Sequence, residues 1–161
     1  MKKILIIVSL AIVALDQWTK MYIKSNFALH ESRPVIDGFF DITYVLNPGA
    51  AFGFLAKLDD TYRRGFFVVV TIIAIAAVAY LLYKEKGMKL RLISYTLVLA
   101  GAAGNFIDRI YMGKVVDFLL FYYKTYQWPA FNVADTAISI GIGLLMLDYF
   151  FIKRSKDESN A

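Results

Sequence analysis

The sequence predicts an all-α membrane protein with four transmembrane helices and a small extracytoplasmic cap that is rich in β-structure. Of the 161 residues, 59% are hydrophobic and only 19% are charged, whereas soluble domains use roughly 45 to 50% apolar residues. The mean hydropathy is +0.56. Four apolar segments, at about 4–23, 65–83, 90–110 and 131–152, approach the roughly 20 residues that cross the hydrocarbon core. We therefore expect one integral membrane domain over residues 1–161, with cap regions at about 24–64 and 111–130.

The first apolar segment follows Lys2 and Lys3, so it also fits a cleaved signal peptide. Its apolar run continues beyond Asp16 to Trp18, Met21 and Tyr22, and no convincing small-residue cleavage site follows its core. We therefore expect an uncleaved membrane anchor that forms the first spanning helix.

The basic residues set the expected orientation. They crowd the N-terminus, the loop between the second and third segments, and the C-terminus: Lys2, Lys3, Lys84, Lys86, Lys89, Arg91, Lys153, Arg154 and Lys156. The positive-inside rule makes these three regions cytoplasmic. Lys57, Arg63 and Arg64 in the longer first loop weaken this contrast without reversing it. The same rule explains the net charge of +5, so we expect no nucleic-acid partner.

The cap regions carry β-strand signals. A turn at Asp37-Gly38 lies between two apolar pairs, and the hydrophobic residues at 40, 42, 44 and 46 alternate with more polar neighbours. This pattern predicts a small hairpin. The aromatic run from Phe121 to Trp128 predicts a further strand before Pro129, and residues 50–58 form a candidate short interfacial helix. Because backbone near a membrane must satisfy its own hydrogen bonds, we expect these pieces to form one cap.

Polar and small residues recur at helical spacing in the last two segments. The third segment has Gly101, Gly104, Asn105 and Asp108 on one stripe, and the fourth has Asn132, Asp135, Thr136, Ser139 and Gly143. Close helix packing is the simplest explanation of such stripes, because small and hydroxyl residues let transmembrane helices approach. Packing explains Gly101, Ser139 and Gly143, but it does not explain two aspartates and two asparagines.

These polar residues converge at one membrane face in the expected topology. The third helix brings Asp108 and Arg109 to its outer end, the fourth starts there with Asn132 and Asp135, and the first delivers Asp16 and Lys20. Asp16 and Lys20 form an i, i+4 pair, and Asp108 is next to Arg109, so both acids are expected to be structural anchors. Asp117 and Asp135 have no obvious local cation. They are the predicted reacting pair.

Two carboxylates close enough to interact share one proton, so one acts as base and the other as acid. In peptide hydrolysis the ionised acid takes a proton from water, and the protonated acid donates to the carbonyl oxygen and later to the leaving nitrogen. The pair titrates as a unit, which leaves the position of the proton open. A magnesium or calcium site is the competing interpretation, but it would need an oxygen-only shell.

Other catalytic groups are scarce. The sequence has no cysteine, and its one histidine, His30, lies in a polar loop with no nucleophile elbow nearby. We expect His30 to be a solvated loop residue. Thiol chemistry is excluded, and a catalytic triad is not favoured.

Five motifs in order resemble those of the lipoprotein signal peptidases, also called signal peptidase II. They are Asp16-Gln17-Trp18-Thr19-Lys20, Asn47-Pro48-Gly49-Ala50-Ala51-Phe52-Gly53, Gly104-Asn105-Phe106-Ile107-Asp108-Arg109, Val115-Val116-Asp117-Phe118 and Phe131-Asn132-Val133-Ala134-Asp135. The resemblance covers nearly the whole chain. Each motif alone is weak, but five in order are highly specific.

The resemblance implies an aspartyl endopeptidase of the bacterial cytoplasmic membrane with four spanning helices. Such an enzyme removes the signal peptide of prolipoproteins, cutting just before a diacylglyceryl-modified cysteine. The resemblance assigns catalysis to Asp117 and Asp135, without metal or cofactor. It assigns support and substrate positioning to Asp16, Asn47, Gly49, Asn105, Asp108, Arg109, Asn132 and Ala134, and we add Lys20 as the partner of Asp16. The expected partners are the lipidated precursor and membrane lipid, and we expect a monomer.

Two other classes stay open. Prepilin peptidases and presenilin-like proteases also use two aspartates, but their Gly-x-Gly-Asp pattern is missing here. A small proton-coupled carrier would be expected to show repeated halves or broken helices at the bilayer midplane. The acids lie at one edge of the predicted bundle, which favours surface-accessible catalysis.

Overall fold

Four long helices and a small sheet make up the computed structural model, which describes residues 2–49 and 59–159. The helices are α1 (Lys2–Asn26), α2 (Asp60–Lys84), α3 (Lys89–Met112) and α4 (Val133–Ser159). Within the described residues, four helices are long and apolar enough to span a membrane. This confirms the predicted fold class. The candidate helix at 50–58 lies outside the described residues.

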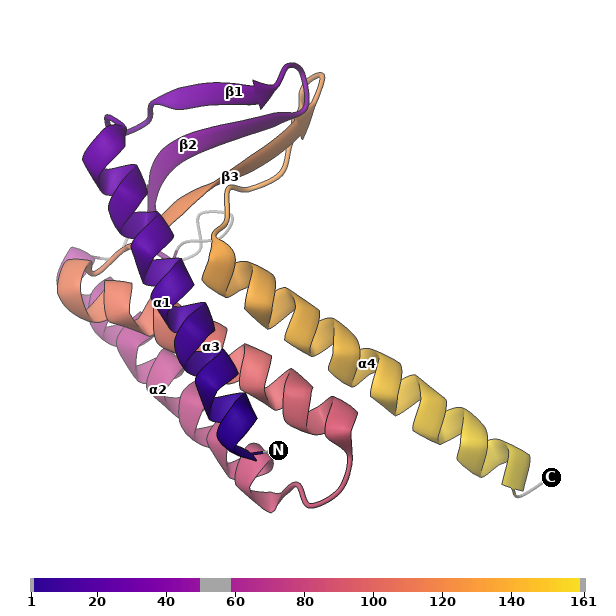
Figure 1. The fold of residues 1–161 in the computed structure, drawn as a ribbon. Coiled ribbons are helices and arrows are strands. Elements are labelled where there is room, and N and C mark those ends of the chain that lie inside the picture. The colour runs from indigo at the N-terminus through magenta and orange to yellow at the C-terminus, as the bar shows by residue number, and fades with distance from the viewer. Residues whose placement is uncertain (1, 50–58, 160–161) are drawn as a thin grey trace.

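The helices are arranged around α3, which contacts α1, α2 and α4. Figure 1 shows the sheet at one end of the bundle, and both termini and the α2–α3 connection at the other. We call these the sheet end and the far end. At the far end an ion pair joins α3 to α4, with Arg91 Nε 2.6 Å from Asp148 Oδ2. At the sheet end α4 leaves from beside the sheet, and its first turn contacts α3 at Gly101, Gly104 and Asn105.

The sheet consists of β1 (Ser32–Ile36), β2 (Phe40–Asn47), β3 (Val115–Tyr123) and β4 (Tyr126–Gln127), paired antiparallel in the order β1-β2-β3-β4. The predicted hairpin is confirmed, with Gly38 in its turn at a φ of 76°. The predicted strand at 121–128 is two strands. A turn at Lys124, where φ is 54°, separates them. The first of these strands, β3, starts as early as Val115, because it pairs along β2 as far as Asn47.

The buried core and the exposed apolar surface lie in different parts of the molecule. The buried core joins α1 to the sheet through Ile23, Val116 and Phe118. In contrast, α2 has no buried residue, although its span has a mean hydropathy of 2.7. A helix this apolar can keep its surface exposed only where the solvent is itself apolar, as in a lipid bilayer. The helix also starts five residues before the predicted segment, because the side chain of Asp59 accepts a hydrogen bond from the Thr61 amide and caps it.

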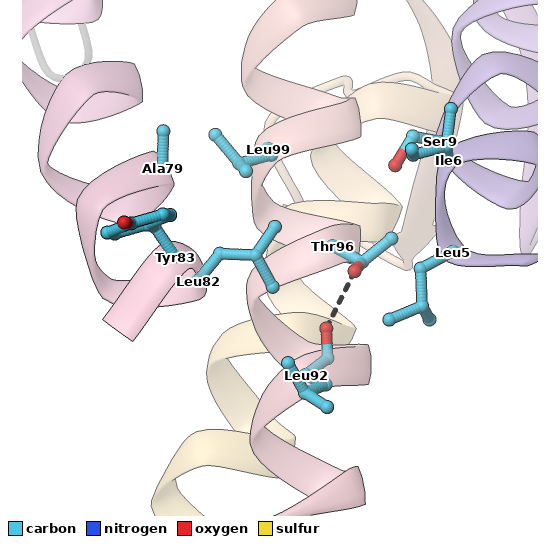
Figure 2. A pocket seen from close by; sticks show the side chains of 9 residues that line it. All are labelled: Leu5, Ile6, Ser9, Ala79, Leu82, Tyr83, Leu92, Thr96 and Leu99. Atoms are coloured by element: carbon cyan, nitrogen blue, oxygen red, sulfur yellow. Dashed lines mark hydrogen bonds between the residues drawn. The ribbon is translucent and has the colours of Figure 1, made fainter. Parts of the chain in front are cut away.

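An apolar cavity of about 280 Å³ lies between α1, α2 and α3 towards the far end. Figure 2 shows its lining, which is Leu5, Ile6, Ser9, Ala79, Leu82, Tyr83, Leu92, Thr96 and Leu99. The Thr96 hydroxyl donates to the Leu92 carbonyl at 2.6 Å, so its proton is used inside α3. None of its described lining residues is an acid. The acids of the predicted site are therefore to be found elsewhere, at the sheet end.

Candidate active site

A buried lysine lies at the centre of the polar cluster between α1 and α3. Its Nζ atom is 2.8 Å from Asp16 Oδ2 and 3.1 Å from Asp108 Oδ2, and it donates to Asn105 Oδ1 at 2.9 Å. Lys20 and these three partners are each at most 4% exposed. Buried ions cost several kcal/mol unless they are paired and hydrogen-bonded. One lysine therefore allows two carboxylates to be buried here, and Asp108 pairs with Lys20 rather than depending on its neighbour in sequence, Arg109.

Further hydrogen bonds to these two acids tie the elements together. Asp16 Oδ1 accepts from the Ala134 amide at 2.9 Å, and Asp108 Oδ2 accepts from the Val116 amide at 3.1 Å. Gln17 donates to Asp16 at 3.1 Å and to Asp108 at 3.2 Å. Asp16 thus fixes the start of α4, and Asp108 fixes β3 next to Asp117.

Small residues let α3 and α4 approach closely enough for these contacts. A Cβ added to Gly104 would lie 2.6 Å from Asp16 Oδ2, and one added to Gly101 would clash with the Ala134 carbonyl oxygen. Ala134 itself is fully buried. The glycine stripe therefore serves packing, as the sequence suggested, and it also makes room for a carboxylate.

Asn132 explains where α4 begins. Its side-chain Oδ1 accepts from the Asp135 amide at 2.9 Å, and its own amide donates to Asp135 Oδ2 at 3.3 Å. This reciprocal pattern is a capping box in which aspartate replaces the usual glutamate or glutamine. The cap starts α4 at Val133, two residues after the predicted start. It also holds the Asp135 carboxylate at the first turn.

Three asparagines supply donors to the two remaining acids. Asp117 Oδ1 accepts from the Asn132 side chain at 2.7 Å, and its Oδ2 accepts from Asn47 at 2.9 Å. Asp135 Oδ1 accepts from Asn105 at 2.7 Å. Asn132 thus contacts both acids, one through its side chain and the other through its backbone amide. These two acids are held by neutral amides, whereas Asp16 and Asp108 are held by a cation.

Asp117 titrates far from the ordinary range of an aspartate. It lies near the start of β3 and is 1% exposed. Burial raises its pKa from the ordinary value of 3.8 to about 7, and the negative charge of Asp135 adds to this, although the hydrogen bond from Asn47 opposes it. A carboxyl of this kind exchanges its proton near neutral pH, as a general acid or base must.

Two further residues border this pair. Asn47 is oriented by Gly49, whose amide donates to Asn47 Oδ1 at 2.8 Å. Gly49 has a φ of 88°, and an added Cβ would lie 2.6 Å from the Phe67 ring, so only glycine fits. The Arg109 guanidinium carbon lies 5.9 Å from the centre of the same ring. Its charge interacts with those of Asp135 and Asp117.

The structure therefore gathers all eleven predicted site residues at the sheet end. In the ranges 2–49 and 59–159, no three His, Cys, Asp or Glu side chains are grouped as a metal site would require. The prediction omitted two side chains that matter here. Gln17 had a signal, because it is a polar residue next to Asp16 in an apolar helix. Phe67 had none, because one phenylalanine among the many apolar residues of α2 carries no positional information.

The arrangement has the parts of a two-carboxylate acid and base catalyst. Two acids on separate elements, β3 and α4, contact one asparagine, and one of them binds a proton near pH 7. Their amide partners are fixed in turn by Lys20, Gly49 and the α4 cap. Such a pair can move protons to and from a substrate without a metal.

Known proteins resemble this chain over nearly its whole length. The family model for signal peptidase (SPase) II matches residues 8–151. A lipoprotein signal peptidase of Syntrophus aciditrophicus is 53% identical over 92% of this chain and 91% of its own length, and one of Geobacter metallireducens is 45% identical over 98% and 97%. A solved bacterial membrane enzyme superposes with a TM-score of 0.82 at 34% identity, covering 98% of this chain and 91% of the other. The sequence, the fold and the arrangement of acids agree, and the chain belongs to the signal peptidase II family.

Proposed function

We propose that this chain is a membrane aspartyl endopeptidase that removes the signal peptide from diacylglyceryl-modified prolipoproteins, with Asp117 and Asp135 as its catalytic pair. The relatives named lipoprotein signal peptidase support the substrate and the reaction. The observation that carries the residue assignment is the bridge through Asn132, which contacts both acids while the other buried acids of the sheet end pair with Lys20. Membership of this family argues against a carrier or a presenilin-like protease.

The reaction follows from the proton balance of the pair. Asp117, with a pKa of about 7, holds the proton, and Asp135 is the base. Asp135 takes a proton from water as the water oxygen attacks the peptide carbonyl carbon, while Asp117 donates to the carbonyl oxygen. The tetrahedral intermediate then returns a hydroxyl proton to Asp117, and Asp135 delivers its proton to the nitrogen as the C–N bond breaks. The products are a carboxylic acid and a free amine, and the pair is restored.

The supporting residues act by position. Lys20, Asp16 and Asp108 hold α1, β3 and α4 in register, so they place the pair without exchanging protons with it. Asn105 and Asn132 orient the carboxylates. Arg109 is charged and only half-buried, so it is the candidate for binding substrate backbone carbonyls or the ester groups of the lipid.

We further propose the orientation expected from the basic residues. The termini and the α2–α3 connection, which lie together at the far end, are cytoplasmic, and the sheet end faces outward. The scissile bond then reaches the pair at the outer edge of the bilayer while the diacylglyceryl chains stay in lipid. Each buried CH₂ contributes about 0.8 kcal/mol, so the acyl chains are the main anchor of the substrate. One copy of the chain supplies both acids, so a monomer suffices.

The decisive experiment uses purified protein and a diacylglyceryl-modified precursor, with release of the signal peptide as the readout. Asp117→Asn and Asp135→Asn should each abolish cleavage, because general acid and base contributions are about 10² to 10⁴-fold each. Asp37→Asn, in the exposed hairpin turn, is the matched control and should cleave normally. Near-normal turnover by either site variant would refute the catalytic assignment. An unlipidated precursor of the same sequence should be cut much more slowly, and equal rates would refute lipid-dependent recognition.

A further inference from the structure

A small pocket lined by basic residues lies where the start of α2 meets the end of α3. It has a volume of about 240 Å³, and its lining includes Asp60, Arg63, Arg64, Gly113 and Lys114. Among the described residues, three cations and one acid border the pocket, so these residues make it positively charged. The pocket is separate from the catalytic pair, because no residue of the pair or of its asparagine partners lines it.

The cations of this basic pocket differ in how they are held. Arg63 pairs with Asp60, and Arg64 donates to the Ile110 carbonyl at the end of α3. Gly113 has a φ of 70°, and an added Cβ would lie 3.0 Å from Arg64 Cδ, so the turn after α3 packs against this side chain. Among the described residues, Lys114 makes no hydrogen bond or ion pair. A half-buried lysine thus borders the pocket with no hydrogen bond or ion pair to the part of the chain that the structure describes.

The depth of the pocket identifies its surroundings. Asp60 to Arg64 lie at the start of one spanning helix, and Gly113 and Lys114 directly follow another, which ends at Met112. Helix ends of this kind lie at the level of the lipid headgroups, because the intervening 24 or 25 residues cover the hydrocarbon core. The most abundant anion at that level is the phosphate of the phospholipids. Arginine and lysine are the usual phosphate ligands of proteins.

We propose that the basic pocket binds the phosphate group of an anionic membrane phospholipid. Lys114 and Arg64 are its principal ligands. The substrate of the proposed reaction carries a diacylglyceryl group without phosphate, so the lipid bound here is a resident lipid and not the substrate. This site also accounts for basic residues at 63 and 64 outside the regions that the positive-inside rule favours. Because Arg64 connects α2 to the end of α3, the bound lipid would stabilise the contact between these two helices beside Phe67 and Arg109.

The test measures lipid binding directly, so its outcome does not depend on the peptidase function. Purified protein in neutral detergent is titrated with phosphatidylglycerol, and retained lipid is counted by native mass spectrometry. Wild-type protein should bind one phosphatidylglycerol more tightly than the Lys114→Gln variant does, by about fivefold, which corresponds to about 1 kcal/mol for one basic residue near anionic lipid. Lys86→Gln, an exposed lysine beyond the other end of α2, is the matched control and should behave as wild type.

Two further arms separate the possible ligands. Diacylglycerol, which lacks the phosphate, should bind independently of Lys114. Inorganic phosphate at the same concentrations should neither bind detectably nor displace the lipid. Equal phosphatidylglycerol binding by wild type and Lys114→Gln would overturn the proposal, and so would Lys114-dependent binding of diacylglycerol. Tight binding of inorganic phosphate alone would overturn the assignment to a lipid.

Discussion

Replacing Asp117 by asparagine should stabilise the protein relative to wild type as the pH rises. In wild type, the buried carboxyl must ionise inside the protein above pH 7, whereas asparagine stays neutral at every pH. Asparagine keeps the shape of the protonated acid, and it can still accept one of the two hydrogen bonds that Asn47 and Asn132 donate. Losing the other hydrogen bond changes the stability of the variant by an amount that does not depend on pH. The change with pH in the stability difference between variant and wild type therefore reports only the ionisation of Asp117.

The size of the effect follows from the pKa of Asp117, which is 3.8 ordinarily and about 7 in the folded protein. Below about pH 4 both folded and unfolded states hold the proton. Between about pH 4 and pH 7 only the folded state holds it, so the free energy of unfolding falls as the pH rises, by about 1.4 kcal/mol per unit. Above pH 7 both states are ionised and the loss is complete. From pH 5 to pH 8 the loss in wild type is therefore about 3 kcal/mol, as an upper estimate.

Thermal unfolding in detergent at pH 5 and pH 8 measures this difference. The melting temperature of Asp117→Asn minus that of wild type should grow by about 6 to 12 °C between the two pH values, since 1 kcal/mol corresponds to about 2 to 4 °C at this size. Asp37→Asn should show no such trend, because that carboxyl is exposed. A difference that stays constant with pH would refute the raised pKa, and with it the assignment of the proton to Asp117.

Three more variants test the supporting structure. Lys20→Met should lower the free energy of unfolding by about 3 to 5 kcal/mol in thermal unfolding, because it leaves two buried carboxylates without a cation. A loss no larger than that caused by the exposed Lys24→Met would contradict this. Gly104→Ala should cost about 1 to 3 kcal/mol by overpacking, while Gly143→Ala, with nothing within 4 Å of the added Cβ, should cost nothing. Asn47→Ala should raise the pKa of Asp117 further, moving the alkaline limb of the pH–rate profile upward; an unmoved limb would count against Asn47 as its donor.

The sequence predicted those features that depend on neighbours along the chain. Apolar runs of membrane-spanning length predicted four helices, and the alternation around Gly38 predicted the hairpin. The i, i+4 spacing of Asp16 and Lys20 predicted their ion pair. Helical spacing in α3 likewise placed Asn105 and Asp108 on one face. In each case the period of the helix or strand is enough to determine which side chains meet.

Contacts between distant segments were not predictable in the same way. Lys20 also pairs with Asp108, and Asn47 donates to Asp117 across the sheet, but neither contact follows from any local period. The start of β3 at Val115 was not predicted, because its pairing with Asn47 of β2 joins segments that are far apart in the sequence. The register of β3 against β2 and the packing of α1 on α3 fix these contacts, and both are properties of the whole fold.

The different partners of the four acids suggest why the protein buries so many. A cation beside a carboxylate stabilises its ionised form, which suits an anchor but prevents two acids from sharing a proton. Lys20 contacts Asp16 and Asp108 directly, while its effect on the pKa of Asp117 is the weakest of those that act on that group. Amide donors satisfy the oxygens of Asp117 and Asp135 without adding charge, so burial keeps the pKa of Asp117 high. Lys20, Asp16 and Asp108 hold the elements rigidly together. Asn105 accepts a hydrogen bond from Lys20 and donates one to Asp135, so it lies between the lysine and that acid. Moving a cation next to Asp117, as in Asn47→Lys, should therefore lower the pKa of that carboxyl and remove the acid that cleavage requires.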